Sequence, residues 1–157
     1  MGRTLILIAL LAALTVPAAL AGDRATDGTL SVKRGKGAIT LKIKGTVIGR
    51  VQNGRVQVRD FRPYDGNEAH FTGCKARHPS FGVSICKGRV VGYRVDDGRF
   101  NVNVRGRAIS ITAVGRGSVI VDGAGLSDGV MSMDGALYSS LPDDPTTFAL
   151  GITVAGR

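Results

Sequence analysis

The chain has no tryptophan, three tyrosines and five phenylalanines among its 157 residues. Proteins that bind single-stranded nucleic acid without regard to sequence stack the bases on aromatic side chains. Platforms that bind sugars by stacking need the same rings. The shortage therefore disfavours both kinds of surface.

Helical patterns are also missing. After the first segment, no stretch shows the 3.6-residue apolar period of an amphipathic helix. Instead, glycines recur every few residues and β-branched residues alternate with polar ones, which is typical of short strands joined by tight turns. We expect an all-β fold, an antiparallel β-sandwich of roughly nine to eleven short strands. A small β-barrel is the alternative, although nothing in the pattern specifies closure.

Two stretches predict hairpins. In TVIGRVQNGRVQVRDF, a turn at Asn53-Gly54 would place Val51 opposite Val56. In VVGYRVDDGRFNVNVR, a turn at Asp97-Gly98 would gather the valines and both aromatic residues on one face and leave arginine and asparagine on the other. This sorting predicts a sheet with one buried and one solvent-exposed face.

The first 21 residues predict a secretory signal peptide. They combine Arg3, an apolar run, the helix breaker Pro17 and the small-x-small sequence Ala19-Leu20-Ala21. We expect cleavage after Ala21, which leaves residues 22–157 as a single all-β domain with no transmembrane span. An uncleaved anchor is the open alternative, because the uncharged run is just long enough to cross a bilayer. The predicted location is secreted or associated with the cell envelope.

The two cysteines lie in one short segment, CKARHPSFGVSIC. Disulfides persist in exported proteins, so we predict a bond between Cys74 and Cys86. His70 and His78 could complete four zinc ligands, but the spacing is unlike the short ligand pairs of zinc sites. The third possibility is that both cysteines are free thiols.

Other motifs that could carry chemistry are weak. Gly125 to Gly129 match G-x-S-x-G around Ser127, but neither a helix pattern nor a histidine follows, as the nucleophile elbow of hydrolases requires. Asp122, Asp128 and Asp134 each precede a glycine and are weak calcium candidates, although such pairs more often mark turns. We predict no catalytic residue and no metal site. Because no G-x-G-x-x-G or Walker A loop occurs, we also predict no cofactor.

Charge is the most informative feature. The chain has 21 basic and 12 acidic residues. Between Ser31 and Arg62, nine basic residues accompany the single acid Asp60. If the strands of this region are neighbours, five cations share one solvent-exposed face and form a candidate anion-binding site: Lys42, Lys44, Arg50, Arg55 and Arg59. Such a face attracts polyanions.

A resemblance supports export. The run VRGRAISITAVGRGSVIVDGAG and the later LPDDPTTFALG resemble a group of exported, glycine- and arginine-rich proteins of actinobacteria that have no assigned activity. The resemblance covers roughly residues 88 to 151 and rests on turn glycines. It implies export and an all-β fold, and it transfers no functional residue.

The sequence therefore predicts an exported, non-enzymatic binding or structural module that contacts anionic lipid or an acidic wall polymer through its basic sheet face. One alternative is a module that binds double-stranded nucleic acid, which would show steep salt dependence. A second alternative is a small cell-wall enzyme that uses Cys86 or Ser127.

Overall fold

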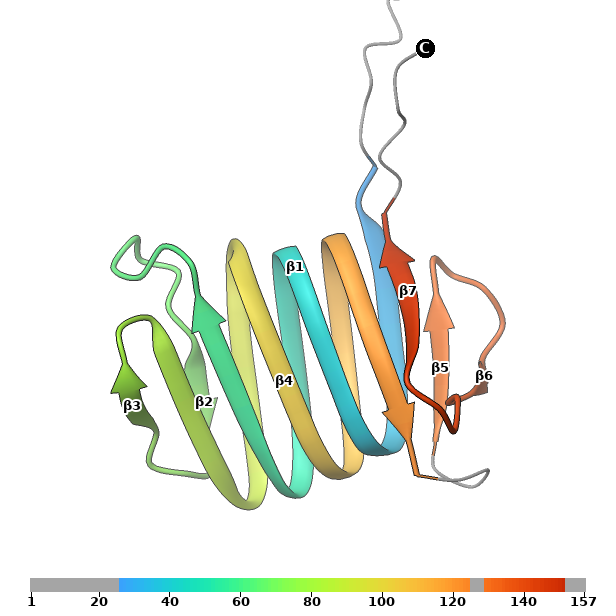
Figure 1. The fold of residues 1–157 in the computed structure, drawn as a ribbon, viewed down its shortest axis with the longest axis horizontal. Coiled ribbons are helices and arrows are strands. Elements are labelled where there is room, and N and C mark those ends of the chain that lie inside the picture. Colours follow the sequence, from blue (N-terminus) through green and yellow to red (C-terminus); the bar gives the residue numbers. More distant parts are fainter. Residues whose placement is uncertain (1–25, 125–128, 152–157) are drawn as a thin grey trace, which may run out of the picture.

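The computed structural model describes residues 26–124 and 129–151, and these residues form strands, turns and loops without a helix. No segment of this described part is therefore a helix able to cross a membrane. The expected signal peptide, residues 1–21, lies outside it. Figure 1 shows the strands β1 (Gly28–Asp60), β2 (His70–Thr72), β3 (Arg77–Ser80), β4 (Val83–Gly123), β5 (Val130–Met133), β6 (Ser139–Ser140) and β7 (Thr146–Leu150).

Two of these strands are very long and wind around each other. β1 pairs with β4 along both of its edges, and both pairings are antiparallel. Leu41, for example, lies between Val102 and Val119, which are 17 residues apart on the same strand. The two strands thus form a double coil, as Figure 1 shows. In the pairing register, one turn takes about 17 residues of each strand.

The coil is flattened, so successive half-turns lie in two facing layers. The first sheet contains, in spatial order, β6, β5, residues 28–36, 107–115, 46–54, 88–97 and β2. The second sheet contains, in the same direction, β7, residues 116–123, 37–45, 98–106, 55–60, 83–87 and β3. The prediction of an antiparallel, sandwich-like all-β fold is confirmed, and the sheet does not close into a barrel. Many of the expected short strands are straight segments of two continuous ribbons.

Glycines mark the corners where the ribbons pass from one layer to the other. Gly45 pairs with Gly98 on one side and with Gly115 on the other, so glycines of different turns lie side by side along this edge. At Gly45 the φ angle is +153°, and a Cβ atom would lie 2.1 Å from the carbonyl oxygen of Val114. Only a hydrogen atom fits there, because the backbones of adjacent turns approach closely.

The two predicted hairpins are wrong. Val51 pairs with Val91 rather than with Val56, and Val95 pairs with Val47. Asn53 and Asp97 do adopt the left-handed conformation, with φ angles of 44° and 42°, but they lie at corners of the coil and not at hairpin tips. The predicted division into buried and exposed side chains is still correct. A two-residue hairpin turn and a corner of the coil each shift the alternation of inward and outward side chains by one residue.

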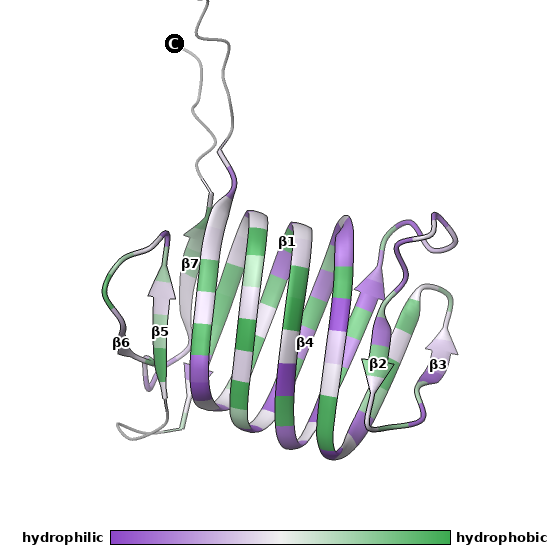
Figure 2. Ribbon diagram, turned by 180° about the vertical axis from the view of Figure 1, so that it is seen from behind, coloured by the Kyte–Doolittle hydropathy of each residue, from purple (hydrophilic) through white to green (hydrophobic). Residues whose placement is uncertain are grey.

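The core lies between the two layers. Along the coil, apolar residues alternate with polar ones, as the bands in Figure 2 show, and the apolar set points inward. Each fully buried valine, leucine or isoleucine stabilises the fold by roughly 1.5–3 kcal/mol relative to an exposed one. The largest fully buried side chains are those of Phe100, Leu30, Ile39, Leu41, Ile109, Ile111 and Leu150.

Candidate anion-binding face

The coil brings together four of the five predicted cations. Lys42 and Lys44 point outward from residues 37–45, and Arg55 and Arg59 point outward from residues 55–60. Both segments belong to the second sheet, and all four side chains are exposed.

Arg50 does not belong to this group. It lies between Gly92 and Ser110 on the first sheet, whose outer face is on the opposite side of the sandwich. The prediction that all five cations share one surface is therefore wrong for Arg50. The corner at Asn53-Gly54 turns the chain into the other layer, whereas a hairpin would have kept Arg50 on the same face of one sheet as Arg55 and Arg59.

Further cations complete the surface. Residues 98–106 lie between the two predicted segments and contribute Arg99 and Arg105, and residues 83–87 contribute Lys87 beside Arg55. We call the resulting surface the cationic face, and its members are Lys42, Lys44, Arg55, Arg59, Lys87, Arg99 and Arg105. All seven are exposed, and none forms an ion pair with another described residue. Asp122, beside Ala38, places one carboxylate at the margin of this face.

Several of these cations are directly opposite one another on adjacent strands. Arg55 lies between Arg105 and Lys87, and Lys44 lies between Arg99 and Arg116. Like charges at directly opposed positions destabilise a sheet. Arg116 is partly compensated by its ion pair with Asp27, at 3.2 Å. The pairs around Arg55 have no such compensation within the described part of the chain.

The middle of the cationic face is hollowed. A groove of about 450 Å³ is lined by Thr40, Arg55, Gln57, Arg59, Phe61, Asn101, Asn103 and Arg105. Thr40, Asn103 and Gln57 form a row across three neighbouring segments, since Asn103 pairs with Thr40 and Gln57 on its two sides. We call this row the groove floor. Its side chains are shorter than the arginines beyond it, which accounts for the hollow.

Hydrogen bonds orient the groove floor. The Asn103 Nδ2 atom donates to the Thr40 Oγ1 atom at 2.7 Å. The Arg55 Nη2 atom donates to the Gln57 Oε1 atom at 2.9 Å. These bonds leave the Asn103 carbonyl oxygen and the Gln57 amide hydrogens without a partner among the described residues, and a ligand can use them.

The segment CKARHPSFGVSIC is closed by a disulfide bond between its two cysteines. Cys74 and Cys86 form a disulfide with their Cα atoms 5.9 Å apart, which confirms that prediction. Cys86 is fully buried in the core and anchors the preceding loop to β4. Closing this short loop stabilises the fold by roughly 3 kcal/mol in the chain-entropy model. Because both thiols are consumed, neither can be a zinc ligand or a nucleophile while the bond is intact.

Neither histidine lines the groove. His70 is in β2, opposite Arg94. The His78 Nδ1 atom is 3.0 Å from the Ser84 Oγ atom. Within the described residues, no three histidine, cysteine or acidic side chains gather closely enough to hold a metal ion.

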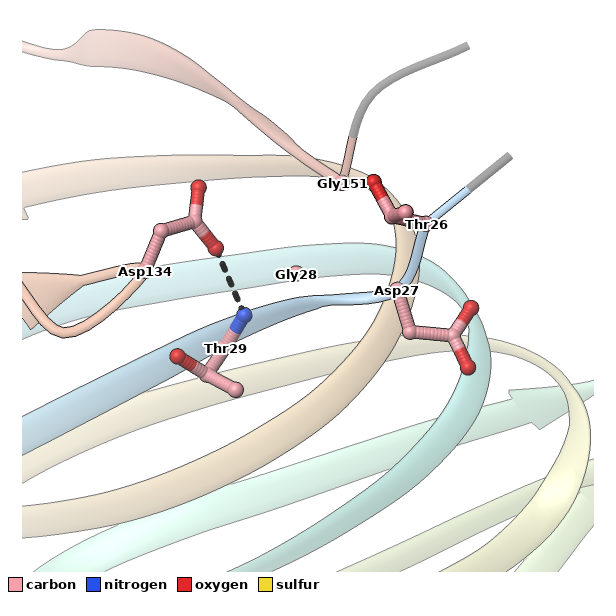
Figure 3. Close-up of a pocket in the computed structure, with 6 residues that line it drawn as sticks. All are labelled: Thr26, Asp27, Gly28, Thr29, Asp134 and Gly151. Carbon is pink, nitrogen blue, oxygen red and sulfur yellow. Dashed lines mark hydrogen bonds between the residues drawn. The ribbon is translucent and has the colours of Figure 1, made fainter. Parts of the chain in front are cut away.

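The aspartate series does not come together as one site. Asp122 lies on the second sheet, and the Asp134 Oδ1 atom accepts a hydrogen bond from the Thr29 backbone nitrogen at 2.8 Å. Asp27, the other carboxylate of the hollow drawn in Figure 3, points away from Asp134. Asp128 and the candidate nucleophile Ser127 lie outside the described residues.

Sequence reasoning missed half of the groove. Asn101 and Asn103 were expected on the polar face of one hairpin and Arg55 on that of another, but no signal linked the two. The link is long-range: residues 98–106 lie between residues 37–45 and residues 55–60. Phe61 was also missed. It comes directly after the last residue of β1 and extends the strand past Arg59.

Comparisons with known proteins found no relative of this chain. No protein-family model, no curated protein and no solved structure matches the chain.

Proposed function

We propose that this protein is an exported, non-catalytic binding module that holds an anionic polymer of the cell envelope on its cationic face. One observation carries the proposal. Arg105, Arg55 and Lys87 are at directly opposed positions on three adjacent strands, without a compensating carboxylate. A sheet selected for stability alone would alternate charges at these positions. A bound polyanion would relieve the repulsion and thereby stabilise the folded state.

The rest of the molecule supports a binding role. Seven exposed cations share one face of the two-layered sandwich, so a polyanion that lies on this face contacts several of them at once. The disulfide is compatible with an oxidising, extracytoplasmic location, as the N-terminal sequence predicts. The resemblance to exported actinobacterial proteins points in the same direction.

The test compares two variants that lose the same charge from opposite sides. Arg55→Gln removes a cation from the cationic face, and Arg50→Gln removes one from the outer face of the first sheet. Each is titrated calorimetrically with linear polyphosphate at several salt concentrations. We expect Arg55→Gln to weaken binding by about tenfold and to flatten the salt dependence, whereas Arg50→Gln changes affinity by less than about twofold.

Equal effects of the two variants would show that net charge, and not this face, governs binding. An absence of binding at low salt to every anionic polymer tried, polyphosphate and hyaluronate included, would contradict the proposal outright. Vesicles that contain phosphatidylglycerol serve as a second probe. A strong preference for vesicles over every soluble polymer would assign the face to lipid instead.

A further inference from the structure

The groove is not uniformly cationic, and its charge pattern indicates what kind of polymer it fits. Arg55 and Arg105 lie at one end, while Arg59 lies at the other, with the neutral groove floor between them. Arg55 and Arg59 are four residues apart on one strand, so their Cα atoms are separated by about 13 Å. A ligand that contacts the cations at both ends therefore spans the neutral floor, where the Arg55 guanidinium reaches Gln57.

The groove floor is suited to hydroxyl groups. It presents an acceptor, the Asn103 carbonyl oxygen, and donors, the Gln57 amide hydrogens. A hydroxyl group both donates and accepts, so it satisfies either partner. A phosphate oxygen only accepts, so a phosphate placed over the Asn103 carbonyl oxygen cannot pair with it. Nucleic acid, with about one charge per 1.7 Å of duplex axis, would put phosphates there.

An aromatic ring lies at the Arg59 end of the groove. Phe61 is 53% exposed and lines the hollow beside Asn101 and Arg59. Its ring offers an apolar surface of the kind that packs against the C–H face of a sugar. One ring is no extended platform, so the cations and amides must supply most of the recognition.

We infer that the groove binds an acidic polysaccharide in which a charged sugar alternates with a neutral one, and this inference rests on the proposed function. The charged sugars contact Arg55 and Arg105 at one end and Arg59 at the other. The neutral sugar between them donates to Asn103 and accepts from Gln57. Phe61 packs against a sugar ring at the end of the groove.

The test uses two polyanions that differ in the spacing of their charges and in whether they have hydroxyl groups. Hyaluronate oligosaccharides alternate glucuronate with a neutral N-acetylated sugar, and linear polyphosphate has dense charge and no hydroxyl along its chain. Wild type, Asn103→Ala and Phe61→Ala are titrated with both probes at one salt concentration. Gln52→Ala removes an exposed amide from the first sheet and is the matched control.

We expect Asn103→Ala and Phe61→Ala each to weaken hyaluronate binding by roughly five- to tenfold, while polyphosphate affinity stays within about twofold. Gln52→Ala should change neither affinity. Circular dichroism and thermal unfolding verify that each variant is folded, and Phe61→Ala serves as the second variant because its side chain is largely exposed.

The outcomes separate this inference from the proposed function. If polyphosphate binds through Arg55 but hyaluronate does not bind, or binds independently of Asn103 and Phe61, the glycan assignment is overturned and the anion-binding face stands. If duplex DNA binds more tightly than hyaluronate at equal salt, the assignment is likewise overturned. If neither polymer binds, both proposals fail together.

Discussion

At the scale of single residues, the polar side chains that matter are those whose surroundings conflict with their chemistry. Asp60 ends β1, and its Oδ2 atom is buried without a hydrogen-bond partner among the described residues. Burial raises the pKa of this carboxyl. The hydrogen bond from the Arg62 backbone nitrogen to Oδ1, at 2.7 Å, lowers the pKa, and the charges of Asp65 and Glu68 raise it further. The net shift is upward.

This shift predicts a pH-dependent contribution to stability. A carboxyl with a raised folded-state pKa binds its proton more tightly when folded, so its stabilising contribution is present below its unfolded pKa and is lost as pH rises through the folded pKa. Asp60→Asn removes that loss and retains the Oδ1 acceptor. We expect its stability relative to wild type to increase from pH 3 to pH 7, measured by urea unfolding.

The control for Asp60 is Asp143→Asn, which changes an exposed aspartate elsewhere on the surface. This variant reports what the loss of one exposed surface carboxylate does by itself. A parallel response of the two variants would contradict the assignment to Asp60.

At the scale of elements, the pairing of segments is decided at the corners, where each ribbon passes from one layer to the other. A hairpin turn and a corner of the coil use the same residue types, because both need a left-handed residue and a glycine. The sequence therefore predicted where the chain changes direction and which side chains face inward. It could not predict which segments pair, since a corner leads into the other layer while a hairpin returns along the same one. The misplacement of Arg50 follows from this single ambiguity.

Close packing at the corners predicts a large cost for one methyl group. Gly45→Ala places a Cβ atom against the carbonyl oxygen of Val114, whereas Gly66→Ala adds one in open space. Both glycines have positive φ angles, of 153° and 91°, so both variants carry backbone strain. We expect the free energy of unfolding to fall by about 1 kcal/mol for Gly66→Ala and by at least about 2 kcal/mol more for Gly45→Ala.

Chemical denaturation of both glycine variants measures this difference. Equal losses would mean that adjacent turns do not approach each other at Gly45, and the double coil would then need revision at that corner.

At the scale of the whole molecule, the fold depends on two strands that are distant in sequence and inseparable in space. Each inner turn of β1 is hydrogen-bonded on both edges by turns of β4, and the core is formed by side chains from both. Neither strand can bury its apolar face alone. This arrangement requires long-range pairing before any stable core exists, so we expect slow and cooperative folding.

A cut in the connecting loop tests this interdependence. A protease site inserted after Gly66, which is exposed, separates β1 from the rest of the chain. The disulfide does not bridge the cut, because Cys74 and Cys86 both follow it. We expect the two fragments to co-elute in native size-exclusion chromatography and to separate in urea. Separation under native conditions would contradict the interwound arrangement.

The sequence by itself determined the all-β class, the inward and outward faces, the disulfide between Cys74 and Cys86 and the concentration of basic residues before Arg62. These follow from local alternation, cysteine spacing and composition. Only the tertiary structure decided that Arg99, Asn103 and Arg105 lie between Lys42 and Arg55, and that Arg50 lies on the opposite sheet. The reason is physical: pairing in a coil is set by contacts between backbones of turns far apart in sequence, which no local pattern specifies.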